Sequence, residues 1–362
     1  MALRLIIAIL TILLWAEASL AGNYSQRVFR SAYYLGRGDT GVAVADNHEA
    51  IFYNPAGLAS GKGIYKETVL ASPMVEMSEA TKDLVRKISL EKKESSDSLA
   101  DEMGNNQHLG FNHFSGIILR RVALGAFASN QIDILPSLSA ESHGLPTVDA
   151  RTVSNTGITF SIAEKFMGDH LLLGTTIKHF IARQQAGLNI AIADASDVSN
   201  QLEADDLIDT GSGTGADLGM ILRFGKKAPF SLGLHIENVG DTKIERVKGE
   251  SSDPDDLKQS VNIGMAVEPG TRSSKFRLLL DYRDVAGAIE TNPLKNIHIG
   301  VEISFFKFIG ITTGFNQGYG TFGGYMNLYA VRFDIGTYTE EVGARIGERP
   351  DTRYFFRLMV GF

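Results

Sequence analysis

The chain contains no cysteine, and its 362 residues include only one tryptophan and nine prolines. The absence of cysteine excludes disulfide frameworks, zinc sites built on thiolates, thiol catalysis and a lipid anchor on an N-terminal cysteine. Lysine and arginine number 35 against 42 aspartates and glutamates, which gives a formal net charge of -7. Without an excess of positive charge, a general binder of nucleic acids or of anionic membrane surfaces is disfavoured.

Long hydrophobic runs are also scarce, and the one that stands out lies at the N-terminus. Arg4 precedes an apolar stretch from Leu5 to Trp15, and Ser19-Leu20-Ala21 places small residues where a signal peptidase cleaves. This pattern predicts a signal peptide over residues 1–21, because the run is shorter than the ~20 residues that a spanning helix needs. The mature chain is therefore expected to be exported. If it enters a membrane, it must do so as a β-barrel.

The rest of the chain is dominated by short segments in which apolar and polar side chains alternate. Alternation with a period of two places successive side chains on opposite faces of a strand. A soluble β-sandwich alternates in the same way, so this pattern alone leaves the fold open. None of the apolar faces carries a charge in the clearest segments, which are 216–224, 230–236, 261–267, 276–282, 297–303 and 331–335.

The lengths of the connections favour a barrel over a sandwich. Connections after odd-numbered strands include the long polar stretches 77–106, 184–212, 240–258 and 340–351, whereas those after even-numbered strands are brief. An even number of strands with short turns at one end and long loops at the other is typical of outer-membrane barrels. The prediction is therefore an all-β fold, a transmembrane antiparallel β-barrel of about 14 strands over residues 63–362. The strands are expected near 64–76, 107–119, 121–133, 152–164, 170–183, 213–224, 229–239, 259–268, 274–283, 295–304, 307–316, 319–327, 330–339 and 352–362.

In such a barrel the apolar faces meet lipid and the opposite faces line the lumen. Charges of both signs on neighbouring strands are expected to pair across the interior and to fill it. Inward Ile221, Leu279, Phe355 and Met359 favour an apolar pocket among them. The expected lumen-facing charged network consists of Asp217, Arg223, His235, Glu237, Glu268, Arg277, Asp281, Arg283, His298, Glu302, Arg332, Asp334 and Arg357.

The last segment alternates up to a C-terminal phenylalanine. It resembles the terminal strand by which bacterial outer-membrane proteins are recognised for insertion. The expected location is therefore the bacterial outer membrane, with membrane lipid and the barrel insertion machinery as partners. The residues of this expected insertion signal are Tyr354, Phe356, Leu358, Val360 and Phe362.

Residues 22–62 precede the first expected strand and do not alternate cleanly. Their glycines and alanines suit a compact plug inside the barrel, and they contain the string Phe52-Tyr-Asn-Pro-Ala-Gly-Leu-Ala59. With Asp46 before it, this stretch resembles the N-terminal hatch of the FadL-type and PorV-type outer-membrane barrels, which carries an Asn-Pro-Ala motif. The resemblance implies that the hatch closes the lumen of a fourteen-stranded barrel and that its motif is Asn54, Pro55 and Ala56.

The resemblance also implies a function. It points to the uptake of long-chain fatty acids or other hydrophobic compounds, so a fatty-acid-like small molecule is the expected ligand. The alternative is a PorV-like barrel that docks or shuttles exported proteins, or has a structural role beside them, and whose lumen is sealed by hatch and charges. Both readings expect no enzymatic activity, no metal, no cofactor and no nucleic-acid partner. Only His235 and Glu237, with His298 and Glu302, imitate a metal or acid–base cluster, and no zinc, nucleophile or phosphate-binding motif accompanies them.

Overall fold

The computed structural model describes residues 27–60, 65–90, 102–138, 146–185, 188–191, 208–225, 230–248, 254–271, 273–290, 292–306, 308–343 and 345–362. The signal peptide expected over residues 1–21 and most of the 184–212 connection lie outside these ranges. Among the described residues, no helix is both long enough and apolar enough to cross a bilayer.

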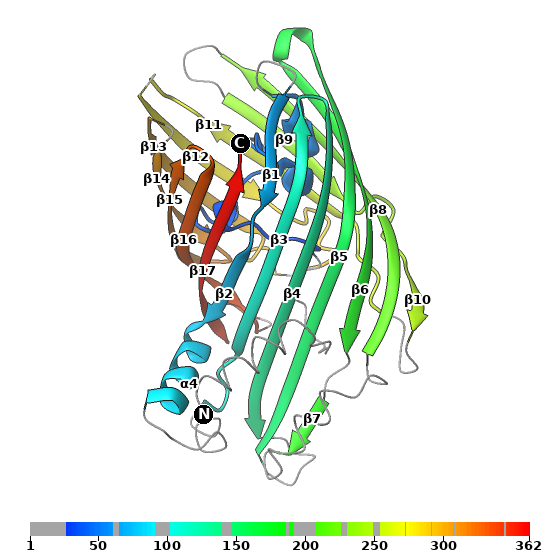
Figure 1. The fold of residues 1–362 in the computed structure, drawn as a ribbon, viewed down its shortest axis with the longest axis vertical. Helices are drawn as coiled ribbons and strands as arrows, with labels where there is room; N and C mark the ends of the chain where they lie inside the picture. Colours follow the sequence, from blue (N-terminus) through cyan, green and yellow to red (C-terminus); the bar gives the residue numbers. More distant parts are fainter. Residues whose placement is uncertain are drawn as a thin grey trace.

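Seventeen strand elements form one closed antiparallel sheet (Figure 1). The sheet closes where β17 pairs with both β1 and β2. Three wall strands consist of two elements each, namely β1 with β2, β6 with β7 and β9 with β10, so the sheet is a barrel of fourteen strands, as predicted. The elements are β1 (Tyr65–Ala71), β2 (Met74–Ser78), β3 (Gln107–Leu119), β4 (Val122–Leu138), β5 (Pro146–Phe166), β6 (Leu171–Gln185), β7 (Leu188–Ala191), β8 (Ile208–Phe224), β9 (Phe230–Glu237), β10 (Ile244–Lys248), β11 (Ser260–Val267), β12 (Ser274–Tyr282), β13 (Ile297–Phe305), β14 (Ile309–Asn316), β15 (Tyr319–Leu328), β16 (Val331–Glu341) and β17 (Pro350–Gly361).

Helical structure among the described residues is short. Two single-turn helices and one 3-10 helix precede β1, a second 3-10 helix joins β5 to β6, and one amphipathic helix of 12 residues follows β2. These are α2 (Ala32–Leu35), α3 (Ala50–Tyr53), η1 (Pro55–Ala59), η2 (Met167–Asp169) and α4 (Glu79–Leu90).

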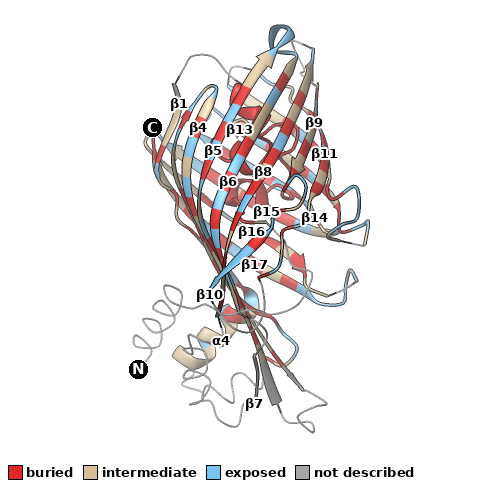
Figure 2. Ribbon diagram, turned by 90° about the vertical axis from the view of Figure 1, so that its right-hand side faces the viewer, coloured by how far each residue is buried: buried red, intermediate tan, exposed pale blue. Residues whose placement is uncertain are grey.

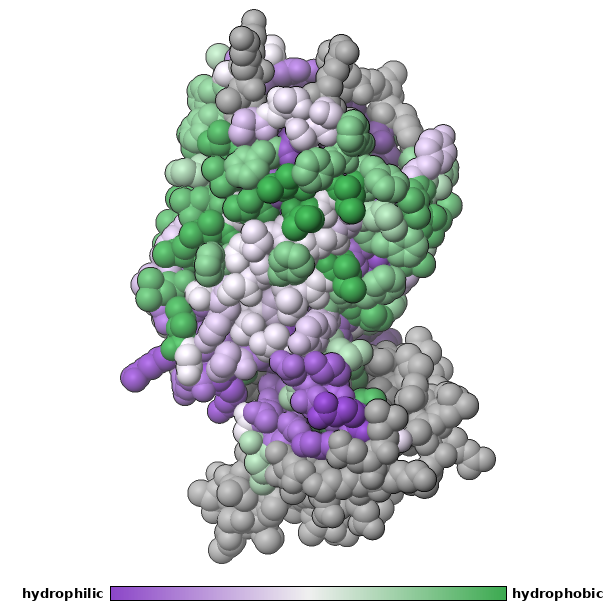
Figure 3. Space-filling view, turned by 90° about the vertical axis from the view of Figure 1, so that its left-hand side faces the viewer, coloured by the Kyte–Doolittle hydropathy of each residue, from purple (hydrophilic) through white to green (hydrophobic). Residues whose placement is uncertain are grey.

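The outer face of the barrel is apolar. On β12, Leu278 and Leu280 are 46% and 39% exposed, whereas the intervening Leu279 and the flanking Arg277 and Asp281 are buried. The same alternation on the other strands gives a hydrophobic band, green in Figure 3, which ends at a hydrophilic region. The apolar faces therefore point outward, as the absence of charge from them predicts.

Strands β4, β5, β6 and β8 are longer than predicted and project past their neighbours toward the end that bears α4 (Figure 1). The added residues of β8 include Thr210 and Ser212, which are outward-facing and polar, so the apolar alternation stops before the strand does. The strict sorting of loops has one exception among the connections described. Only Gln317 and Gly318 join β14 to β15 at the end where the other loops are long.

The N-terminal segment, residues 27–60, lies within the ring of strands (Figure 1). Nearly all of its residues are buried, as the red segments inside the barrel in Figure 2 show. We call this segment the plug. It fills the lumen and brings its own polar and apolar side chains against the inward faces of the wall.

Candidate functional site

The plug backbone touches the barrel wall at glycine positions. A Cβ atom placed on Gly219 of β8 would lie 2.1 Å from Oδ1 of Asn54, and one on Gly300 of β13 would lie 2.4 Å from the carbonyl oxygen of Arg37. Any larger residue at these two wall positions would therefore collide with the plug. The boundary between plug and wall is the candidate functional site, because a molecule that crosses the lumen must separate these surfaces.

The Asn-Pro-Ala motif lies at one of these close contacts. Nδ2 of Asn54 donates to the carbonyl oxygens of Met220 and Leu234 in the wall, at 3.2 Å each, and to that of Val42 in the plug, at 2.6 Å. Oδ1 of Asn54 accepts a hydrogen bond from the amide of Ala56 at 3.1 Å, which caps η1. Asn54 thus joins the plug to β8 and β9 and also orders the turn that follows it.

Replacing Asn54 with alanine is expected to lower the free energy of unfolding by about 1–3 kcal/mol, because these buried hydrogen bonds are lost together. Urea titration of the purified barrel in detergent measures this change. Asn105→Ala is the control, since this exposed loop asparagine donates to Glu102 at 3.0 Å and its loss is expected to change the value by less than about 0.5 kcal/mol. Equal stability of the wild type and the Asn54 variant would contradict an anchoring role for the motif.

Buried charges hold another side of the plug. The carboxylate of Glu302 on β13 accepts hydrogen bonds from Nη1 of Arg37 at 2.7 Å, from the hydroxyl of Tyr33 at 2.8 Å and from Nη1 of Arg277 at 3.3 Å. The hydroxyl of Tyr325 also donates to it at 2.8 Å. All five side chains are buried. Each charge therefore depends on its partners, because solvent does not replace them.

Further polar contacts surround this cluster. Asp281 of β12 accepts hydrogen bonds from the amides of Gly41 and Val42 at 2.7 and 3.0 Å. Three carboxylates of the plug pair with arginines of the wall: Asp39 with Arg283 (2.7 Å), Asp46 with Arg277 (2.8 Å) and Glu49 with Arg357. The plug is therefore bound to β12, β13 and β17 by ion pairs that its movement would break.

The residues of the expected charged network differ in burial and in what they contact. Arg223, Glu268 and Arg332 are half-buried, and the other ten are buried. Arg277, Asp281, Arg283, His298, Glu302 and Arg357 contact the plug directly. Pairs within the wall also form, and they include Lys178 with Asp217, Arg277 with Glu268, and both Arg332 and Arg357 with Asp334.

His235 and Glu237 on β9 do not join His298 and Glu302 on β13 into a metal-binding group. In the described part of the chain, no set of three or more histidine, cysteine, aspartate or glutamate side chains is arranged to hold a metal ion. His298 instead contacts the carbonyl oxygen of Gly38 through Nδ1 at 3.0 Å. Glu302 is occupied by the contacts described above, with Tyr33 and Arg37 of the plug and with Arg277 and Tyr325 of the wall.

Sequence reasoning missed the charged partners on the plug and one in the wall. Arg37, Asp39 and Glu49 of the plug meet wall residues, and Lys178 of β6 pairs with Asp217 at 2.9 Å. These three plug residues stand among glycines and alanines in the sequence. Charged residues in such a compact segment are the signal that could have identified them as partners of the wall. Lys178 follows the inward alternation of β6 and was identifiable from periodicity.

The charge of Glu49 predicts a pH dependence. Burial by itself raises the pKa of this plug carboxyl, but Arg357, His48 and the hydroxyl of Ser31 outweigh burial and bring the pKa down to about 2. A lowered carboxyl pKa stabilises the folded state above the pKa of the unfolded chain, near 4.5, and this contribution of about 3 kcal/mol is lost as the pH falls from there toward 2. Unfolding titrations across this range should show a steeper loss for the wild type than for Glu49→Gln, and parallel curves would contradict the assignment.

The plug meets β3 and β4 through aromatic rings. Phe52 stacks on Phe29 at 4.5 Å between ring centroids and meets Phe127 of β4 edge-on at 5.4 Å. Phe114 of β3 lies 6.0 Å from Phe52 and stacks with His48 of the plug at 5.5 Å. Among the described residues of these contacts, the one polar contact across the boundary is that of His48 with Glu67, at 3.0 Å through Nδ1, so this half of the boundary is held mainly by apolar packing.

Next to this aromatic cluster, the strand pairing of the wall is interrupted and the outer surface of the wall has an apolar hollow. Pairing of β1 with β3 ends at Val69 opposite Gly116 and resumes on β2 at Met74 opposite Asn112, with Pro73 in the gap. Proline cannot donate to a ladder, and such positions interrupt strand pairing. An apolar hollow of about 630 Å³ lies on the lipid-facing side of this region, and its lining includes Leu70, Ser115, Ile117, Leu124, Ile158 and Ile177.

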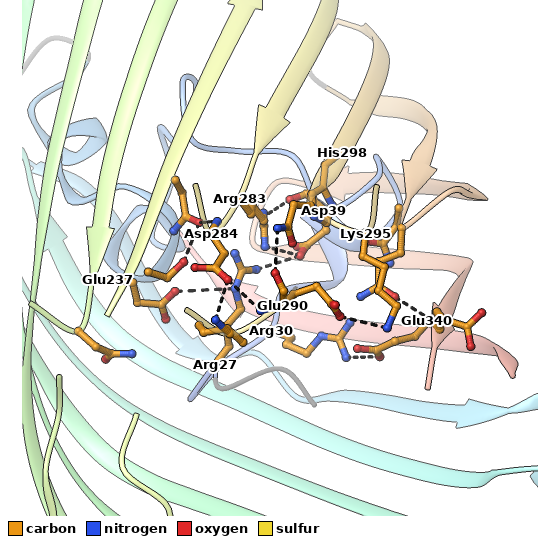
Figure 4. A pocket seen from close by; sticks show the side chains of 18 residues that line it. Arg27, Arg30, Asp39, Glu237, Arg283, Asp284, Glu290, Lys295, His298 and Glu340 are labelled. Atoms are coloured by element: carbon orange, nitrogen blue, oxygen red, sulfur yellow. Dashed lines mark hydrogen bonds and ion pairs between the residues drawn. The ribbon is translucent and has the colours of Figure 1, made fainter. Parts of the chain in front are cut away.

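A polar chamber of about 110 Å³ lies on the opposite half of the lumen, between the plug and the strand ends (Figure 4). Ile289 is the one aliphatic side chain in its lining, and the rest are charged, amide, hydroxyl or imidazole groups. Leu279 and Phe355, which favoured an apolar pocket at the sequence level, are instead covered by the plug. Leu279 packs with Ala43 and Val44, and Phe355 packs with Ala32 and Leu35.

A closed antiparallel barrel of fourteen strands, apolar outside and filled by its own N-terminal segment, defines the class as plugged transmembrane β-barrels. No family model and no curated protein matches the chain. Solved structures do share its fold, and they include transporters for toluene and a channel for monoaromatic hydrocarbons.

The Pseudomonas putida toluene transporter TodX matches with a TM-score of 0.51 and 10% identity, over 92% of this chain and 98% of that one. The Ralstonia pickettii toluene transporter TbuX matches with a TM-score of 0.50 and 11% identity, over 92% and 98%. The CymD monoaromatic hydrocarbon channel matches with a TM-score of 0.54 and 11% identity, over 92% and 97%. The chain therefore has the fold of FadL-type channels, as its N-terminal motif suggested.

Proposed function

We propose that the protein is an outer-membrane channel for the uptake of hydrophobic small molecules, with fatty-acid-like compounds among its ligands. Residues 22–62 would form its hatch, of which 27–60 are described as the plug, and Asn54, Pro55 and Ala56 would anchor it. The shared fold with transporters and channels for aromatic compounds supports transport. Lipid contact and assembly through Tyr354, Phe356, Leu358, Val360 and Phe362 stay predictions of this proposal, as does the signal peptide.

One observation carries the proposal, the division of the plug boundary into an aromatic half and a charged half. An apolar molecule cannot compensate the buried charges of an ion pair that it separates. It can, however, replace ring contacts such as those of Phe52 with Phe127. The aromatic half lies against the wall that carries the break at Pro73 and the outer hollow. The proposed route therefore passes between the plug and β3–β4 and reaches the bilayer there.

A docking barrel for exported proteins is the second candidate. The polar chamber favours it, because a lumen sealed by plug and charges needs no apolar pocket. The two candidates differ in one respect that can be measured. Transport requires the plug to move, whereas docking at the loops does not.

The test is to tether the plug to the wall. The chain has no cysteine, so Ala43→Cys with Ala266→Cys, two positions that share one packed cluster, introduces the only thiols. Uptake of a labelled fatty acid into proteoliposomes is expected to fall at least tenfold when the pair is oxidised and to recover on reduction. Each single variant is the control, and a gel shift confirms the bond. Uptake that is unchanged by a verified tether, or absent throughout, would refute hatch-gated transport and favour docking.

A further inference from the structure

Among the described residues, the polar chamber contains two donors without a hydrogen-bond partner and one carboxylate held by long ion pairs. Among the described residues, Nδ2 of Asn262 and Nε of Arg283 have no hydrogen-bond acceptor, although both side chains are more than nine-tenths buried. Glu237 is 7% exposed, and its nearest cations, Arg27 and Lys178, are each 3.9 Å away, beyond hydrogen-bond distance. Buried donors of this kind are normally satisfied, so the two N–H groups point to a missing acceptor beside the loosely paired carboxylate.

The three groups lie side by side on adjacent strands. Ser260 and Asn262 of β11 pair with Glu237 and His235 of β9, so the side chains of Asn262 and Glu237 are diagonal neighbours. Arg283 directly follows β12, and the amide of Asp284 donates to Oδ1 of Asn262 at 3.0 Å. Diagonal neighbours across a ladder stand about 7–8 Å apart. A small molecule can therefore span them.

The other charged side chains that line the chamber already have ion-pair or hydrogen-bond partners. Asp39 pairs with Arg27 and Arg283, Glu340 with Arg30 and Glu290 with Lys295. Asp284 accepts the amides of Ala288, Ile289 and Glu290. Figure 4 shows these pairs around the cavity. What remains is the carboxylate of Glu237, whose ion pairs with Arg27 and Lys178 are 3.9 Å long, on one side and the two N–H donors on the other.

We propose that the chamber binds a small zwitterion of the amino-acid type. Its carboxylate would accept from Arg283 and Asn262, and its ammonium group would donate to Glu237. The volume of about 110 Å³ exceeds the roughly 10–15 Å³ that one water needs. No phenylalanine, tyrosine or tryptophan is in the described lining of the chamber, and Ile289 alone is aliphatic, so a hydrocarbon has little to bind there. This inference goes beyond the proposed uptake function, because it concerns a hydrophilic ligand at a separate part of the boundary.

Calorimetric titration of the full chain in detergent with four probes tests the proposal: glycine, acetate, methylamine and toluene. Glycine is expected to bind at least tenfold more tightly than acetate or methylamine, because only glycine satisfies both sides of the site. Glu237→Gln and Asn262→Leu are each expected to weaken glycine binding at least tenfold. Asn296→Ala is the matched control from the same lining, and a change below threefold is expected.

The comparison among probes in the wild-type protein keeps the test independent of variant folding. Equal affinities for glycine and either single-charge probe would overturn the proposal. Binding of none of the four would overturn it in favour of a chamber that holds only water. Toluene binding alone would overturn it as well, while leaving the proposed uptake function intact, so the two failures are distinguishable.

Discussion

Glu302→Ala is expected to lower the free energy of unfolding by about 3–5 kcal/mol and to release the plug from the wall. The substitution leaves Arg37 and Arg277 buried without their shared carboxylate and removes the acceptor of Tyr33 and Tyr325. Arg277 keeps its pairs with Asp46 and Glu268, but Arg37 loses its carboxylate partner, and an unpaired buried charge costs more than the lost attraction. The expected result is a less stable barrel whose lumen opens intermittently.

Two measurements check this expectation. Urea unfolding gives the free energy, and planar-bilayer recording gives the conductance, which is expected to show openings in the variant and almost none in the wild type. Lys243→Met is the control, because its pair with Asp256 is exposed and no measurable change is expected in either assay. A stable and closed Glu302→Ala barrel would show that the buried ion pairs do not hold the plug.

Gly219→Val is expected to displace the plug without destroying the barrel. Its side chain would occupy the space of Oδ1 of Asn54, which lies 2.1 Å from the position of a Cβ atom, and the amide of Ala56 at 2.8 Å. The plug is the part that gives way, because the wall strand is held by hydrogen bonds to both neighbours and the plug contact is local. The Asn54 hydrogen bonds to Met220 and Leu234 are lost in the process.

The absence of native cysteine makes this displacement measurable. Leu58→Cys places one thiol at a fully buried position of the plug, where maleimide labelling is expected to be slow. Adding Gly219→Val should increase the labelling rate at least tenfold. Gly320→Ala is the matched control, since a Cβ atom there meets nothing within 4 Å and the rate should stay unchanged. Slow labelling in the Gly219 variant would mean that the wall, and not the plug, adjusts.

The barrel itself could be predicted from local patterns. The segment predicted at 259–268 is β11, Ser260–Val267, and the one predicted at 274–283 is β12, Ser274–Tyr282. Alternation is a property of neighbouring residues, and the bilayer enforces it because the lipid-facing side of a barrel must be mainly apolar. Where the strands leave the apolar band, as at Thr210 and Ser212, this constraint ends and the prediction of strand length fails.

The plug contacts could not be predicted because they join distant parts of the chain. Arg37 and Glu302 are separated by 265 residues, and nothing near either residue indicates the other. Sequence periodicity places Leu279 and Phe355 on the inward face but does not say what covers them. The partners, Ala43 for Leu279 and Leu35 for Phe355, lie in a segment without periodicity.

The unequal strand lengths give the barrel a slanted rim. At about 3.3 Å per residue, the 21 residues of β5 extend for roughly 70 Å along the strand, and the 9 residues of β13 for roughly 30 Å. At the end that bears α4, one side of the mouth therefore stands well above the other (Figure 1). If the proposed uptake is correct, molecules that diffuse along the membrane surface meet a higher rim on the β4–β6 side than on the β13–β14 side. Under that proposal, the lower side is the expected direction of entry into the lumen.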